Sequence, residues 1–255
     1  MNSEPNPFEA AAVGVDPHRD AVIGSFVPDG RCLPVGHGFQ WLARGWAIFR
    51  TAPGTWMGIA VAFMLLMLAV SSVPFLDVAV NLLIPVLIGG VSIGCKEIDD
   101  GGEVRFMHLF AGFTSNPGGL LLIGLLYLAA MLVLSAVVGV VVALATMLVG
   151  SRYDAASLPL LSLGFLTTLL LFVPTAMAIW LAPPLVVFQR LSAVQAIRTS
   201  FFAAWRNFAP FCLYGLLVLL AAVIASLPLL LGWLVLLPVL YASLYAFYRD
   251  VFFDT

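Results

Sequence analysis

The sequence has little charge: only 9% of its 255 residues are Asp, Glu, Lys or Arg, against roughly 25% in soluble domains. The charged residues are also unevenly placed. The ranges 55–95, 119–189 and 207–248 together contain only three of them. A water-soluble globule carries charge over its whole surface, so this distribution excludes a soluble fold. The formal net charge of −2 excludes a strongly basic protein that binds nucleic acid.

Residue patterns for common chemistries are also missing. Cys32, Cys95 and Cys212 are isolated, which argues against a disulfide framework or a thiolate metal site. The chain has no HExxH motif and no GxxxxGK(S/T) phosphate loop. No long hydrophobic range has an ionisable residue at its centre, as ion-coupled transport requires. We therefore expect a non-enzymatic protein without a cofactor or a bound metal.

Long hydrophobic ranges are what the sequence does contain. A hydrocarbon core of ~30 Å is crossed by about 20 helical residues. The ranges that reach this length are 55–73, 78–95, 119–149, 158–188, 208–227 and 231–248. Isolated strands would leave backbone groups unpaired in lipid, so each range is predicted to be a helix. The predicted fold class is all-α, a polytopic bundle of six transmembrane helices within residues 37–255. Residues 1–36 are polar and proline-rich, and are predicted to form a flexible tail.

Lys and Arg are unequally divided between the two ends of these spans. The N-terminal flank, the loops 96–118 and 189–207, and the C-terminus hold ten of them, whereas the opposite side holds Arg152 alone. Because cytoplasmic loops carry the excess of Lys and Arg, both termini are predicted to be cytoplasmic.

Three segments with aromatic and basic residues, 39–50, 106–113 and 196–206, each precede a proline and then a span. This pattern indicates either a triplicated helical hairpin or convergence on the aromatic belts common to membrane proteins. We expect the segments to form amphipathic helices in the interface, with membrane lipids as their partners. The residues expected to contact lipid are Trp41, Arg44, Trp46, Phe49, Arg50, Phe106, Phe110, Phe113, Arg198, Phe202, Trp205 and Arg206.

Each of the three units consists of one such segment and the two spans that follow it as a hairpin. The second span of each unit contains prolines, which change the course of a helix. Prolines lie before an apolar pair in all three units and are expected either to kink the helix or to act as a gate. These prolines are Pro85, Pro183, Pro184 and Pro238. Gly89, Gly90 and Gly94 form a small-residue face that is expected to allow another helix to pack closely.

The motifs GWAIFRxxPxxW at 45–56, IPVL at 84–87 and LFxGF at 109–113 carry a family resemblance. Over residues 37–251 the chain resembles the BPSS-type family of uncharacterised bacterial inner-membrane proteins. The resemblance implies six spans and an inner-membrane location, with no assigned activity. More remotely, the layout is similar to the membrane domain of some bacterial glycerophosphodiesterases. Their soluble catalytic barrel is missing here, so no catalytic role follows.

Two functions from different classes fit these observations. The first is a non-enzymatic protein that organises lipid or assists another membrane complex, with lipids and other membrane proteins as partners. The aromatic and basic segments favour it. The second is a permease or flippase for an apolar or lipid-like substrate, which would move through a groove opened at the prolines. A continuous groove from lipid to water would favour the permease, and a closed bundle the organising protein.

Overall fold

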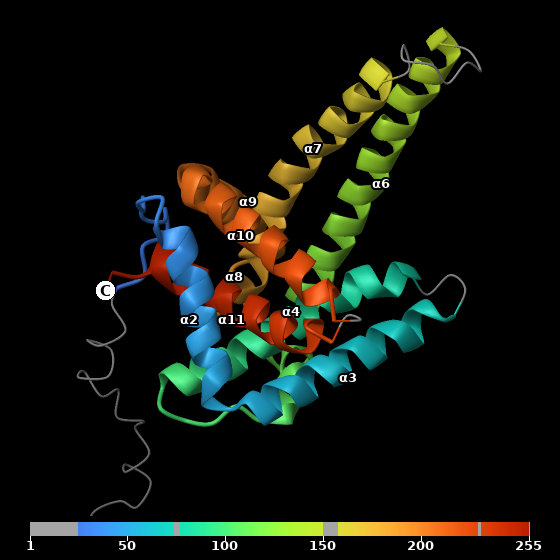
Figure 1. Cartoon of the computed structure of the whole chain (residues 1–255). Coiled ribbons are helices and arrows are strands. Elements are labelled where there is room, and N and C mark those ends of the chain that lie inside the picture. Colours follow the sequence, from blue (N-terminus) through green and yellow to red (C-terminus); the bar gives the residue numbers. More distant parts are fainter. Residues whose placement is uncertain (1–24, 74–76, 150–157, 229–230, 255) are drawn as a thin grey trace, which may run out of the picture.

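The computed structural model describes residues 25–73, 77–149, 158–228 and 231–254, and these residues are mostly helical (Figure 1). Six helical segments among them are long and apolar enough to cross a membrane. The chain is therefore an integral membrane protein, and the predicted all-α polytopic bundle is confirmed. The helices are α2 (His37–Thr51), α3 (Pro53–Ser71), α4 (Asp77–Asp99), η2 (Phe106–Phe110), α5 (Gly112–Ser115), α6 (Pro117–Val149), α7 (Leu158–Trp180), α8 (Ala182–Phe188), α9 (Ala193–Arg206), α10 (Phe208–Ser226) and α11 (Trp233–Phe252).

The long helices form three successive pairs, α3 with α4, α6 with α7, and α10 with α11. The pair α6–α7 projects away from the rest of the molecule in Figure 1. Its side chains are largely exposed, as at Val133 (65%) and Met147 (81%), which is the environment expected of helices surrounded by lipid. Pro53 and Pro117 begin α3 and α6, where the missing backbone N–H of a proline costs no hydrogen bond.

The short segments before each pair pack in a cyclic order. The segment η2–α5 packs on α4 of the first pair, and α9 packs on α7 and on α8, which follows it. The helix α2 packs on α11 of the last pair, and this is the most extensive contact between any two elements described. Each segment thus covers the second helix of the preceding unit, and α2 closes the cycle.

Two of these contacts have the same close geometry. Gly45 of α2 lies against α11, where an added Cβ would be 2.6 Å from the carbonyl oxygen of Val239. Gly112 of α5 lies against α4, where an added Cβ would overlap the carbonyl oxygen of Val86. Both valines directly follow the proline of their span. The aromatic and basic segments therefore contact equivalent positions of two units, as a repeated hairpin requires.

The third contact uses a hydroxyl group instead of a glycine. Ser200 of α9 is fully buried, and its Oγ donates to the carbonyl oxygen of Met177 at 2.7 Å. The same Oγ accepts from the backbone N–H of Leu181 at 3.0 Å. Leu181 follows Met177 by four residues, so Ser200 occupies the place of an ordinary helical hydrogen bond. The chain breaks there into α7 and α8, although residues 158–188 were predicted as one kinked span.

The predicted flexible tail is wrong for residues 25–36. Phe26 pairs with Phe253 as an isolated β-bridge, and its ring stacks on Phe252 at 5.8 Å. The backbone N–H groups of Val27 and Arg31 donate to carbonyl groups near the chain end. These contacts fix the segment against the end of α11, so its polar composition did not prevent it from ordering. Residues 1–24, and the predicted outer loop with Arg152, lie outside the described residues.

Candidate functional site

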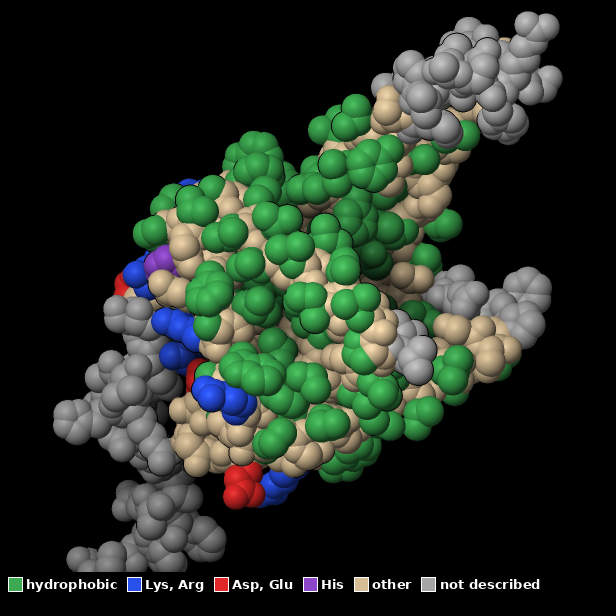
Figure 2. All heavy atoms as spheres, in the orientation of Figure 1, with side chains coloured by type: hydrophobic (Ala, Val, Ile, Leu, Met, Phe, Trp, Pro, Cys, Tyr) green, Lys and Arg blue, Asp and Glu red, His purple; other side chains and the backbone are tan. Residues whose placement is uncertain are grey.

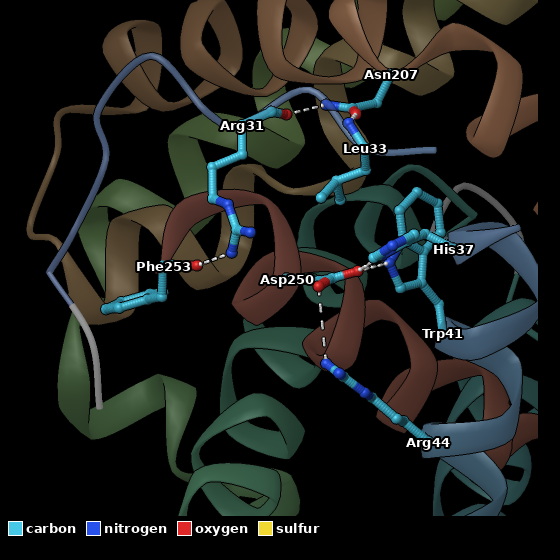
Figure 3. A network of polar contacts seen from close by, with 8 residues as sticks. All are labelled: Arg31, Leu33, His37, Trp41, Arg44, Asn207, Asp250 and Phe253. Carbon is cyan, nitrogen blue, oxygen red and sulfur yellow. Dashed lines mark hydrogen bonds and ion pairs between the residues drawn. The ribbon is translucent and has the colours of Figure 1, made fainter. Parts of the chain in front are cut away.

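A buried carboxylate forms the centre of the polar contacts at the end of α11. Asp250 is only 3% exposed and faces α2 (Figure 3). One of its oxygens, Oδ2, accepts from the indole Nε1 of Trp41 and contacts Nδ1 of His37, each at 2.7 Å. The guanidinium group of Arg44 lies 3.8 Å from the other oxygen. A buried carboxylate is stable only with such partners. The helices α2 and α11 are therefore held together by hydrogen bonds and an ion pair as well as by packing.

A second set of contacts holds the two ends of the described chain together. Arg31 donates from its guanidinium group to the carbonyl oxygen of Phe253 at 2.7 Å. Asn207, fully buried between α9 and α10, donates to the carbonyl oxygen of Arg31 and accepts from the N–H of Leu33 (Figure 3). The segment before α2, the junction before α10 and the end of α11 are therefore joined by hydrogen bonds.

The last turn of α4 adds a further carboxylate to this end of the molecule. Asp99 accepts from the hydroxyl group of Tyr245 at 3.0 Å and lies 3.6 Å from the guanidinium group of Arg249. A cavity of about 300 Å³ lies between these residues and Arg44 of α2. Its two arginines each face a carboxylate, because Arg44 is paired with Asp250, so its charges are balanced.

The amphipathic helix α9 carries the least balanced charge. Its N-terminus is closed by a capping box between Ser192 and Gln195, a sequence signature that favours helix initiation. Its buried face consists of alanines and Ser200, which lets it lie close to α7 and α8. Its outer face includes Arg198 and Arg206, and neither forms an ion pair with a carboxylate among the described residues.

Most of the residues predicted to contact lipid lie at the surface. Trp46 is 44% exposed, whereas Phe202 and Trp205 of α9 are 50% and 60% exposed. Figure 2 shows charged side chains gathered over the end where the described chain ends meet, and apolar side chains over the projecting pair. The other predicted contacts that are exposed or partly exposed are Arg44, Arg50, Phe106, Phe110, Phe113, Arg198 and Arg206.

Two of the predicted lipid contacts are wrong. Trp41 is fully buried and its ring stacks on Phe247 of α11 with centroids 3.8 Å apart. Phe49 is only 5% exposed. Both lie on the same face of α2 as Gly45, four residues before and after it, and this face is the one that meets protein.

The predicted kink and packing residues are all buried. Pro85 and Pro238 lie inside α4 and α11, whereas Pro183 and Pro184 lie in the first turn of α8. The small-residue face of α4 approaches η2 closely, since an added Cβ at Gly90 would lie 2.5 Å from the carbonyl oxygen of His108. Gly94 faces the side chain of His108, and Gly89 faces side chains of α6 and α8.

Sequence reasoning missed Asp250, Asn207 and Ser200 as structural centres. A signal for Asp250 was present, because it follows Ser243 by seven residues and so lies on the same face of α11. Both side chains are buried. Within the described ranges, no group of three His, Cys, Asp or Glu side chains is placed to hold a metal ion.

The chain is similar to a probable inner membrane protein of Burkholderia thailandensis, with 28% identity over 249 residues. The alignment covers 84% of this chain and 90% of that protein. No family model matches the sequence, and no solved structure matches the chain.

Proposed function

We propose that the protein is non-enzymatic and organises anionic lipid, or supports another membrane complex, at the cytoplasmic face of a bacterial inner membrane. One observation carries this proposal. Exposed arginine and aromatic side chains lie together on α2 and α9, directly before the spans α3 and α10. Arginine attracts lipid phosphates, and exposed aromatic rings favour the interface between headgroups and acyl chains. These helices are therefore suited to hold the ends of the adjoining spans at that interface.

The proposed location has separate support. The relative from Burkholderia thailandensis is a probable inner membrane protein. We propose the BPSS-type family as the family of this chain, and the resemblance to it implies the same location. The described chain ends meet through the Phe26–Phe253 bridge, which is consistent with both lying on one side. The excess of Lys and Arg on that side supports a cytoplasmic orientation.

Charge reversal tests the proposed function. Arg50, Arg198 and Arg206 would be changed together to Glu, and to Lys in a matched control that keeps the charge. With the exposed Cys32 and Cys212 replaced by Ser and the buried Cys95 retained, Thr51→Cys would introduce one accessible thiol that reports on the end of α2. The Glu variant is expected to co-purify with less anionic lipid and to react faster with a water-soluble maleimide in vesicles. Equal lipid content and labelling in the two variants would contradict the proposal.

The alternative proposal is a permease or flippase for an apolar or lipid-like substrate. The break between α7 and α8 favours it, because a hydroxyl group that replaces a helical hydrogen bond is a site where a helix can bend. Reconstitution into vesicles with a fluorescent phospholipid would test it. A membrane-impermeant quencher reaches only the labelled lipid in the outer leaflet. If it quenches the inner-leaflet lipid faster in vesicles with the protein than in empty vesicles, the result would favour the flippase over the organising protein.

A further inference from the structure

The outer side of α9 borders a hollow of about 450 Å³. The opposite wall is the Pro28–Asp29 segment, which the contacts at the chain ends hold in place. Each α9 residue that lines the hollow lies three or four positions from another, so all of them share one face of the helix. They are Gln195, Arg198, Thr199, Phe202 and Arg206.

The arginines of this hollow differ from those of the cavity beside Asp99, because neither of them forms an ion pair with a carboxylate among the described residues. Arg206 donates to the backbone carbonyl oxygen of Asp29 at 2.8 Å, which orients its guanidinium group and leaves other N–H donors available. The guanidinium group of Arg198 lies 5.8 Å from the centre of the Phe202 ring. With Asp29 as the one acidic residue of the lining, two arginines leave a net charge of +1.

We infer that this hollow binds the phosphodiester group of an anionic glycerophospholipid, an assignment that rests on the proposed role in organising lipid. A phosphodiester carries one negative charge, which matches the net charge of the lining. Two guanidinium groups offer the forked N–H donors that phosphate oxygens accept, and Gln195 and Thr199 add neutral donors.

The neighbouring face of α9 provides for the apolar part of the ligand. Val194 (63% exposed) and Trp205 (60%) lie beside the polar face, and the buried alanine face lies beyond them. A lipid with its phosphate in the hollow would place its acyl chains along these exposed apolar side chains. Free phosphate would gain nothing from them, so the geometry favours a lipid as the source of the phosphate group.

Native mass spectrometry of the full chain in mild detergent tests this site, with phosphatidylglycerol and phosphatidylcholine of identical acyl chains as probes. The wild type is expected to retain one phosphatidylglycerol in preference to phosphatidylcholine. Arg198→Gln is expected to weaken this retention about tenfold, the loss of one or two charge-assisted hydrogen bonds. Arg190→Gln is the matched control, because Arg190 is also an exposed arginine without a carboxylate partner among the described residues, but lies outside the hollow and outside α2 and α9.

Two further variants keep the test independent of any loss of folding. Asp29→Asn removes the acidic side chain of the lining and is expected to strengthen retention of phosphatidylglycerol. Thr199→Phe fills the hollow without a change of charge and is expected to weaken it. Inorganic phosphate at millimolar concentration is expected not to displace the lipid, and displacement by phosphate would overturn the assignment to a lipid.

The outcomes separate this site from the proposed function. Equal weakening by Arg198→Gln and Arg190→Gln would overturn the hollow as a site while leaving general attraction of anionic lipid intact. A wild-type protein that retains both lipids equally would overturn both. Strengthening by Asp29→Asn together with weakening by Thr199→Phe supports the site.

Discussion

The indole nitrogen of Trp41 lies 2.7 Å from a carboxylate oxygen of Asp250, and this hydrogen bond joins the first described helix to the last. Both residues are buried, with Asp250 3% exposed. Loss of a donor to a buried carboxylate costs more than the hydrogen bond itself, because the charge stays out of water with fewer partners. The closure of the bundle by α2 therefore depends on this pair.

Trp41→Phe is expected to lower the free energy of unfolding by about 1–3 kcal/mol more than Trp56→Phe. Both tryptophans are fully buried, but the indole N–H of Trp56 has no hydrogen-bond partner among the described residues. The two changes thus remove similar volume and differ in the polar contact. Thermal unfolding in the same detergent measures the difference, and equal melting temperatures would show that the bond to Asp250 adds no net stability.

The spans were predictable from sequence because lipid imposes a simple rule on them. Any segment that crosses it must be long, apolar and helical. Apart from the break between α7 and α8, the described spans begin and end within a few residues of the predicted bounds. The side that each interfacial helix turns toward protein was not predictable in this way. Trp41 and Trp46 are the same residue type in the same segment, so composition predicts lipid contact for both. Trp41 is buried and Trp46 is exposed because Trp41 shares the helix face of Gly45, which packs against α11.

Gly45→Ala is expected to destabilise the protein by about 1–3 kcal/mol, because a methyl group there would overlap the backbone of α11. Gly58→Ala in α3 is the control, since no atom of the described residues outside the local backbone of α3 lies within 4 Å of a Cβ at that position. Alanine favours a helix over glycine by about 1 kcal/mol, so Gly58→Ala should be neutral or stabilising. Melting temperatures of the two variants are expected to move in opposite directions, and parallel shifts would refute the close crossing of α2 and α11.

Ser200→Ala is expected to cost about 1–3 kcal/mol, because it removes the shared partner of two buried backbone groups. Ser72→Ala serves as a control, since the Ser72 hydroxyl group is exposed and donates to the carbonyl oxygen of Ala69 in its own helix. Thermal unfolding measures both changes. If Ser200→Ala leaves stability unchanged, α7 and α8 can close into one continuous helix without the hydroxyl group.

The polar centres were harder to predict than the spans for a physical reason. Asp250 lies next to Arg249 at a membrane boundary, where a charged pair is normally solvated. Its burial depends on Trp41 and His37, which are more than 200 residues away in sequence. Such a contact exists only after the bundle closes, so the local pattern can place Asp250 on the face of Ser243 but gives no sign of the partners that it meets there.

Protonation of His108 is expected to weaken the contact between η2 and α4. Burial lowers the pKa of His108 from its ordinary value of 6.5. Two neighbouring charges have smaller effects on this pKa: Glu97 raises it and Arg105 lowers it. The neutral ring is also needed as an acceptor, because its Nδ1 receives the backbone N–H of Arg105 at 3.0 Å. The unfolded chain therefore takes up the proton first as pH falls, and this contribution to stability is present above about pH 6.5 and decreases below it.

His108→Gln tests this dependence, because a glutamine can accept the same N–H at the third position of a capping box and does not titrate. The melting temperature of the wild type is expected to fall more steeply than that of the variant between about pH 7 and pH 5. The contact of His37 with Asp250 is the same in both proteins, so it does not affect the difference between the two curves. Parallel curves over this range would mean that His108 binds its proton equally well in the folded and unfolded chains, contrary to the burial of its ring against α4.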